Sequence, residues 1–175
     1  NATAENLGDE PYQFYQKFPS IKVAVDADRK NGIEQLLTLE KKPQVILLDD
    51  AFQHRKVKAG FYILLTAYDD VFVDDFLLPT GNLRESRSGA QRANLIVVTK
   101  CPKTLSEKEQ TQIKQRIKSY SDAPAYFSTI AFDENVQSSI ASVPVATIQQ
   151  SACVLLAGIA KPASFFNYLT NSASI

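Results

Sequence analysis

Two adjacent aspartates, Asp49 and Asp50, follow an apolar run at 45–48 and are the residues most suited to chemistry. A continuous apolar run is typical of a strand buried on both faces of a parallel sheet. Open parallel sheets place their ligand sites beyond the carboxyl ends of the strands, and paired carboxylates there can hold Mg²⁺ beside phosphates. The pattern therefore predicts a metal and nucleotide site after residue 48. The alternative is an acidic loop that follows a core strand in the sequence and has no part in binding.

A second acidic pair, Asp9 and Glu10, stands at a predicted helix start, directly before Pro11. Asp9 can cap this helix, and proline is tolerated in a first helical turn. The helix dipole favours negative charge at this end, so a carboxylate here could accept a proton from an attacking hydroxyl group. The alternative is an ordinary capping residue without a catalytic part.

Arg84 and Glu85 end a polar segment at 78–85 that reads LPTGNLRE. The fork of an arginine matches phosphate oxygens in a bidentate manner; the alternative is a surface ion pair between these neighbours. His54, the single histidine of the chain, lies four residues after Asp50. It is a second candidate for the same site, and its alternative is a structural or surface position.

Strand-like and helix-like segments alternate along the chain, which predicts an α/β fold with a doubly wound, mainly parallel sheet and helices on both faces. The connection from Asp50 to residue 61 is short for a crossover, so that strand pair is either antiparallel or joined by a compressed helical turn. Residues 1–175 are interpreted as a single domain with a long loop or lid at 67–91. Predicted helices begin near residue 9 and span 28–39, 105–120 (capped by Ser106 or Thr104) and 162–169, and predicted strands span 21–25, 45–48, 61–65, 94–98, 125–130 and 152–157.

Composition narrows the class of protein. Hydrophobic residues make up 45% of the 175, which excludes a disordered chain, and 19 basic residues balance 19 acidic ones, which argues against a nucleic-acid partner. The two cysteines, Cys101 and Cys153, fit no metal motif, and a reducing cytoplasm is the expected compartment. The chain has no apolar run of about 18 residues, so we expect it to be soluble. It has no methionine, so we expect it to be part of a longer protein.

Five motifs stand in a defined order: GDEP at 8–11, DR at 28–29, LLDDAFQHR at 47–55, LLPTGNLRES at 77–86 and GIAKP at 158–162. In this order they resemble the tetraacyldisaccharide 4′-kinase family, the lipid A kinases of Gram-negative bacteria, over nearly the whole chain. The two long motifs are specific as a pair. This sequence has DDAFQH where the family usually has DDGFQH, and LPTGNLRES where it usually has LPAGPLREP. Ala51 in place of glycine makes a positive φ there less favourable.

The resemblance implies a P-loop kinase fold that transfers the γ-phosphoryl group of ATP, with Mg²⁺, to the 4′-hydroxyl of an acylated glucosamine disaccharide, the lipid A precursor. By motif, Asp9 would be the base on that hydroxyl and Glu10 its neighbour near the metal, while Asp49 and Asp50 would hold Mg²⁺. Phosphoryl transfer depends chiefly on positioning and charge neutralisation, which suits acidic metal anchors and cationic clamps. The residues implied to line the nucleotide and sugar-phosphate site are Asp28, Arg29, Gln53, His54, Arg84 and Glu85.

Three family features are not found in this sequence: the GxxxxGK[ST] loop that precedes GDEP, a histidine near the C-terminus, and a hydrophobic N-terminal membrane anchor. The chain is therefore interpreted as the central and C-proximal part of such a kinase. The resemblance implies that the whole protein works at the cytoplasmic face of the inner membrane and contacts the membrane surface through that anchor.

The chain by itself is predicted to bind Mg-ATP weakly and to show no turnover, because the amides and lysine of the GxxxxGK[ST] loop cradle the phosphates. Calorimetric titration of Mg-ATP into this chain and into the full-length protein measures the difference. Tight binding of ATP by the chain alone contradicts the prediction.

Two other classes of protein fit the same residues. One is a non-catalytic α/β module that binds a nucleotide or a metal at its acidic edge, and the other is a different P-loop enzyme, GTPase-like or a small-molecule kinase. The discriminating feature is the sequence before the chain: a Walker loop about 30 residues before GDEP supports the lipid kinase, and its absence from the gene supports the binding module.

Overall fold

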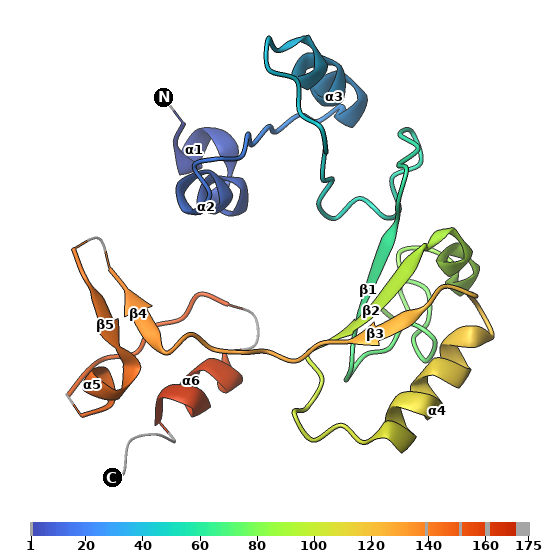
Figure 1. Ribbon diagram of the computed structural model, residues 1–175. Coiled ribbons are helices and arrows are strands. Elements are labelled where there is room, and N and C mark those ends of the chain that lie inside the picture. Colours follow the sequence, from blue (N-terminus) through green and yellow to red (C-terminus); the bar gives the residue numbers. More distant parts are fainter. Residues whose placement is uncertain (1, 139, 151, 160–161, 171–175) are drawn as a thin grey trace.

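The structure is a computed structural model that describes residues 2–138, 140–150, 152–159 and 162–170 (Figure 1). Short helices and strands alternate, and a small sheet with its flanking helices forms the best-packed part. In chain order the elements are α1 (Ala4–Leu7), α2 (Asp9–Lys17), α3 (Arg29–Thr38), β1 (Ile63–Ala67), the 3₁₀ helix η1 (Arg87–Arg92), β2 (Leu95–Thr99), α4 (Glu107–Lys118), β3 (Ala125–Phe127), β4 (Asn135–Gln137), β5 (Ser142–Pro144), α5 (Val145–Gln149) and α6 (Ala163–Thr170).

The central sheet is parallel, with the strand order β1-β2-β3. Ile63 pairs with Leu95 at the start of β1 and β2, and Val97 pairs with Tyr126 across β2 and β3. The chain passes from β1 to β2 through η1 and from β2 to β3 through α4 (Figure 1). Parallel strands joined by helical connections make this an α/β fold, which confirms the predicted class.

The core lies between the sheet and α4. Ile96 and Val98 of β2 have no exposed surface, and Ile113 and Ile117 of α4 pack in the same buried cluster at 5% and 1% exposure. Their spacing of four residues puts both isoleucines on one face of the helix. Ser106 caps α4 in a reciprocal capping box with Glu109, so the prediction of Ser106 as the cap is confirmed.

The opposite face of the sheet is exposed in the described part of the chain. Side chains alternate between the two faces of a strand, and Ile63, Leu65 and Tyr126 on this second face are 50%, 64% and 59% exposed. The whole chain exposes 13524 Å², whereas a compact protein of this length exposes about 8,500 Å². The fold shown is therefore a small parallel sheet with α4 on one face.

Three predicted strands are wrong. The segments 21–25, 45–48 and 152–157 have no strand conformation, and Leu47 and Val154 are 89% and 96% exposed. An apolar run favours burial, but a strand forms only where a neighbour supplies hydrogen bonds and a second layer covers the side chains. None of these segments pairs with a described strand, so apolarity alone does not make them part of the sheet.

The other elements lie close to their predicted positions. α3 begins after Asp28, α6 is shifted by one residue from the predicted 162–169, and β1, β2 and β3 match the predicted strands to within three residues. One expectation fails: Gly8, not Asp9, occupies the cap position of α2. Beyond the predicted elements, the structure has the antiparallel hairpin β4–β5 and helix α5. Because 45–48 is not a strand, the predicted pair of this segment with β1 does not form, and the connection between Asp50 and β1 has no helix.

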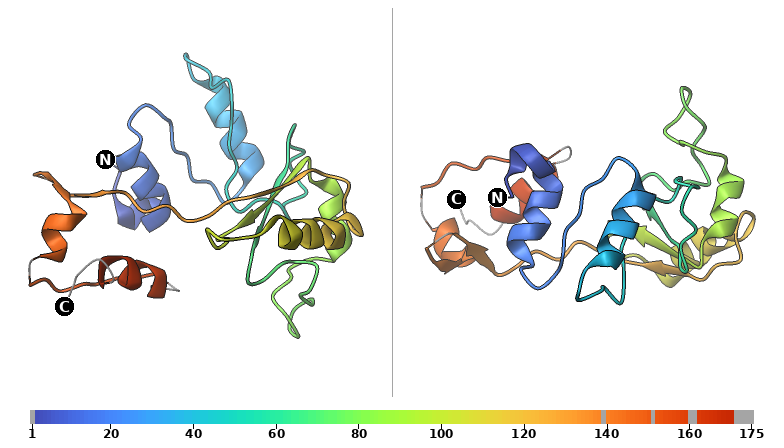
Figure 2. Two further views of the ribbon diagram at one scale, coloured as in Figure 1. Left: turned by 60° about the horizontal axis from the view of Figure 1, so that its bottom comes forward. Right: turned by 90° about the horizontal axis from the view of Figure 1, so that it is seen from above.

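The segment 67–91 is packed at its start and projecting at its tip. Val71, Phe72 and Val73 are buried in the core cluster, whereas the tip around 76–82 stands away from the sheet (Figure 2). Arg87 donates two hydrogen bonds to the Asp75 carbonyl, at 2.9 and 2.7 Å. The segment is thus an ordered part of the fold, and its closure as a lid stays a prediction, as does the single domain over 1–175.

Candidate functional site

The predicted metal pair lies in an irregular loop at 49–55, which we call the acidic loop. Asp49 and Asp50 are exposed there. Asp50 has a φ of 42°, in the left-handed region, one residue before Ala51. Few residues other than glycine adopt this conformation, and aspartate and asparagine do so most readily. The backbone therefore turns at the second aspartate.

Asp50 meets the arginine of the second long motif. Nη1 of Arg84 donates to Oδ2 of Asp50 at 2.9 Å and to Oδ1 at 3.3 Å. Both side chains are largely exposed, at 60% for Arg84 and 70% for Asp50. Ion pairs of this kind contribute about 0–1 kcal/mol. The contact brings two segments 34 residues apart together, and it can open at little cost.

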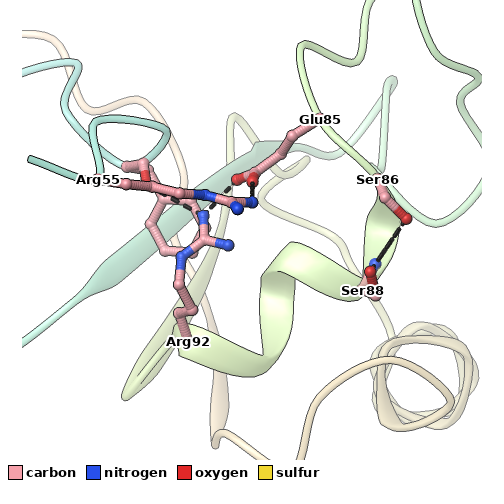
Figure 3. A network of polar contacts seen from close by, with 6 residues as sticks. Arg55, Glu85, Ser86, Ser88 and Arg92 are labelled. Carbon is pink, nitrogen blue, oxygen red and sulfur yellow. Dashed lines mark hydrogen bonds and ion pairs between the residues drawn. The ribbon is translucent and has the colours of Figure 1, made fainter.

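Glu85 lies between two further arginines (Figure 3). Its Oε2 accepts from Nη2 of Arg55 at 3.1 Å, and its Oε1 accepts from Nη2 of Arg92 at 2.5 Å. Burial acts to raise the pKa of Glu85, but the hydrogen bonds and charges of Arg92 and Arg55 outweigh it and hold the pKa below its usual value. Glu85 is therefore a charged carboxylate in a cluster of net positive charge.

Phe52 attaches the acidic loop to the start of the sheet. Its ring packs edge-on against Tyr62, with 6.0 Å between the centroids, and Tyr62 donates its amide to Oδ1 of Asn94 at 2.9 Å. Tyr62 precedes β1 and Asn94 precedes β2. We expected a strand to carry the acidic pair to the carboxyl edge of the sheet. Because that strand is not formed, the loop instead makes its contacts with residues at the amino ends of β1 and β2.

The other predicted site residues are not brought into this cluster by any contact. Asp9 and Glu10 lie in the first turn of α2, and Asp28 caps α3 by accepting from the Lys30 amide at 3.0 Å. All views draw α2 away from the sheet (Figures 1 and 2). Gln53 is exposed in the acidic loop. The sequence analysis did not predict that Arg92 contacts Glu85 and Phe52. The only signal in the sequence is that Arg92 is a basic residue shortly before an apolar strand.

A comparison with known families decides what these motifs belong to. The family model for Tetraacyldisaccharide-1-P 4′-kinase matches residues 1–174, which is nearly the whole chain. The chain belongs to this family. The resemblance drawn from the five motifs is thereby confirmed.

Curated relatives agree with the family model. The chain is 61% identical over 171 residues to the tetraacyldisaccharide 4′-kinase of Flavobacterium johnsoniae, covering 98% of this chain and 50% of the relative. It is 61% identical over 170 residues to that of Flavobacterium psychrophilum, covering 96% and 50%, and 42% identical over 179 residues to that of Bacteroides thetaiotaomicron, covering 96% and 47%. The chain therefore spans about half the length of these relatives. No solved structure matches it.

Membership in a family of kinases raises the question of whether these residues could hold a metal ion. In the described ranges no three His, Cys, Asp or Glu side chains gather as ligands. Mg²⁺ keeps several waters and binds through one or two carboxylates together with substrate phosphates. The exposed carboxylates of Asp49 and Asp50 fit that requirement.

Two further observations concern His54 and the lengths of the helices. Nε2 of His54 is buried and has no hydrogen-bond partner within the described ranges, so this imidazole has an unused donor or acceptor in the acidic loop. Every helix in the described part of the chain is too short or too polar to traverse a bilayer.

Proposed function

We propose that the protein to which this chain belongs transfers the γ-phosphoryl group of ATP, with Mg²⁺, to the 4′-hydroxyl of a tetraacyl glucosamine disaccharide 1-phosphate in lipid A biosynthesis. Membership in the family supports the proposal, and so do relatives called tetraacyldisaccharide 4′-kinase. The structural observation that carries it is the contact of Asp50 with Arg84. The contact supports the proposal because it joins a carboxylate and a guanidinium, one from each long motif, and these groups are suited to bind Mg²⁺ and phosphate oxygens, respectively.

The weakness of the Asp50–Arg84 pair suits this role. When bound, Mg²⁺ neutralises phosphate charge and favours phosphoryl transfer. The side chains of Asp50 and of the preceding Asp49 are both exposed, so both acids are open to an ion with little loss of existing contacts. The Arg84 guanidinium, once released, can bind phosphate oxygens in a bidentate manner.

The remaining roles follow the family motifs and are proposals for individual residues. Asp9 accepts the proton of the 4′-hydroxyl, and Glu10 lies near the metal. The first turn of α2 supports this because it carries both carboxylates on an exposed helix end. The residues proposed to line the nucleotide and sugar-phosphate site are Asp28, Arg29, Gln53, His54, Arg84 and Glu85.

For the whole protein we propose a doubly wound sheet of the P-loop kinase type. The exposed apolar face with Ile63, Leu65 and Tyr126 supports this, because parallel sheets are normally covered on both faces. A further helical layer on that face would remove these side chains from water, and the projecting tip at 76–82 would close over the site as a lid. We further propose that the protein acts at the cytoplasmic face of the inner membrane, where its acylated substrate resides.

Complementation of a strain deficient in the lipid A kinase tests the function. The full gene is expected to restore growth, and the gene with Asp9→Ala is expected to fail, because loss of a general base slows the reaction about 10²–10⁴-fold. Glu5→Ala, an exposed acid in the first turn of α1, serves as the control and is expected to complement. A binding module or another P-loop enzyme does not complement in any form.

A further inference from the structure

Arg92 joins the two long motifs through three separate contacts. It donates Nη2 to the carboxylate of Glu85 at 2.5 Å and to the carbonyl oxygen of Phe52 at 3.1 Å. Its guanidinium also lies 4.8 Å from the centroid of the Phe52 ring. Arg92 belongs to neither motif: it is the last residue of η1, 40 residues after Phe52.

The environment of Arg92 favours arginine over any other cation. Its side chain is only 29% exposed, and that of Glu85 is 18% exposed, so both charges are partly removed from water and their pairing is screened less than at the surface. The planar guanidinium can bond to two acceptors and stack on a ring at the same time, whereas the ammonium of lysine is a compact point charge. The exposed Asp50–Arg84 pair has neither advantage.

Gly89 confines Glu85 to this position. A Cβ placed at Gly89 would lie 2.8 Å from each carboxylate oxygen of Glu85 and 2.7 Å from its Cδ. The carboxylate thus packs directly on the backbone of η1. An added methyl group would displace the carboxylate without removing a charge.

These contacts reach the acidic loop at two residues, Phe52 and Arg55. Arg92 holds the backbone of Phe52 directly and, through Glu85, holds the guanidinium of Arg55. The loop has no helix or strand of its own, so side-chain contacts with η1 determine where its backbone lies. Asp50 is two residues from Phe52, and Arg84 is next to Glu85.

We propose that Arg92 is a positioning residue for phosphoryl transfer: it fixes the acidic loop on η1 and so sets where the Asp50 carboxylate and the Arg84 guanidinium meet the phosphates. The inference rests on the proposed function. Arg92 touches neither the nucleotide nor the sugar in this role. Misplacement of reacting groups by about 1 Å can slow an enzyme about 10²-fold, so a residue that acts through position alone is expected to change kcat more than KM.

The test uses full-length protein with Arg92→Met, Arg92→Lys and Gly89→Ala. The control is Arg116→Met, which removes another paired arginine: Arg116 lies on α4 and pairs with Asp74 at 2.6 Å. Hydrogen exchange is followed by mass spectrometry on the peptide that covers 50–56. We expect exchange about tenfold faster in Arg92→Met and Gly89→Ala, an intermediate rate in Arg92→Lys, and no change in the control.

Kinetics complete the test. We expect kcat to fall about 10–100-fold in Arg92→Met with the KM for ATP changed less than about threefold, and Arg92→Lys to recover part of kcat. Unchanged exchange at 50–56 or unchanged kcat in Arg92→Met overturns the inference. A wild-type protein without kinase activity refutes the proposed function instead, and the exchange data then still show whether Arg92 holds the loop.

Discussion

Asp50→Asn is expected to lower the proposed phosphoryl transfer by the full-length protein about 10²–10³-fold at saturating substrate, the usual effect of removing one preorganised charge from a transition state. The amide keeps the shape of the carboxylate but loses the negative charge that Mg²⁺ requires. The rate is measured with radiolabelled ATP over a range of Mg²⁺ concentrations. Higher Mg²⁺ is expected to recover part of the activity, because the remaining Asp49 can still bind the ion weakly.

The control for this variant is Asp122→Asn, which removes a similarly exposed carboxylate that pairs with Lys118 at 2.8 Å. It is expected to keep full activity. A double-mutant cycle with Arg84→Gln separates two explanations. If Asp50 acts only by holding Arg84, the double variant is no slower than Arg84→Gln. If Asp50 binds the metal itself, the double variant is slower than either single one.

Capping residues and apolar patterns predict helices and strands well where the residues that stabilise an element lie within it or next to it in the sequence. Asp28 and Ser106 accept hydrogen bonds at the starts of α3 and α4, and both caps are readable from residue type and spacing. β2 was recognisable because its apolar side chains do lie in the core, with Ile96 fully buried. In these cases the sequence pattern and the burial agree.

The prediction of strands fails where the conformation of a segment depends on elements that are distant in the sequence. The run at 45–48 is as apolar as β2, yet Leu47 is 89% exposed, because pairing and cover must come from other elements. The hairpin β4–β5 was missed because its strands are three residues each and mostly exposed, so they carry no alternating apolar pattern.

In the candidate site, too, the sequence predicts some contacts and gives no sign of others. The motifs predict that Asp50 and Arg84 belong to one site; the structure brings the two side chains into contact, and their roles stay a prediction. No sequence signal connected Arg92 with Phe52, because a cation can stack on a ring or bond a carbonyl from any distance along the chain. The joint position of Asp9 and Glu10 with the acidic loop stays a prediction, since no contact in the described residues joins them.

Ile117→Ala is expected to lower the free energy of unfolding by about 2–5 kcal/mol, the usual cost of a large-to-small change in a core. Ile117 is 1% exposed and packs from α4 against the sheet, so its truncation leaves a cavity that the strands cannot collapse to fill. Urea unfolding of the full-length protein, followed by circular dichroism, measures the loss. A cost below about 1 kcal/mol would contradict the packing of α4 on β2.

The same measurement on Ile63→Ala tests the proposed second layer of the sheet. Ile63 lies on β1 and is 50% exposed on the uncovered face. If further helices cover that face in the full-length kinase, its truncation is expected to cost nearly as much as that of Ile117, because burial and not residue type sets the loss. A cost well under half that of Ile117→Ala means that the face stays open, and it rules out the doubly wound arrangement for this sheet.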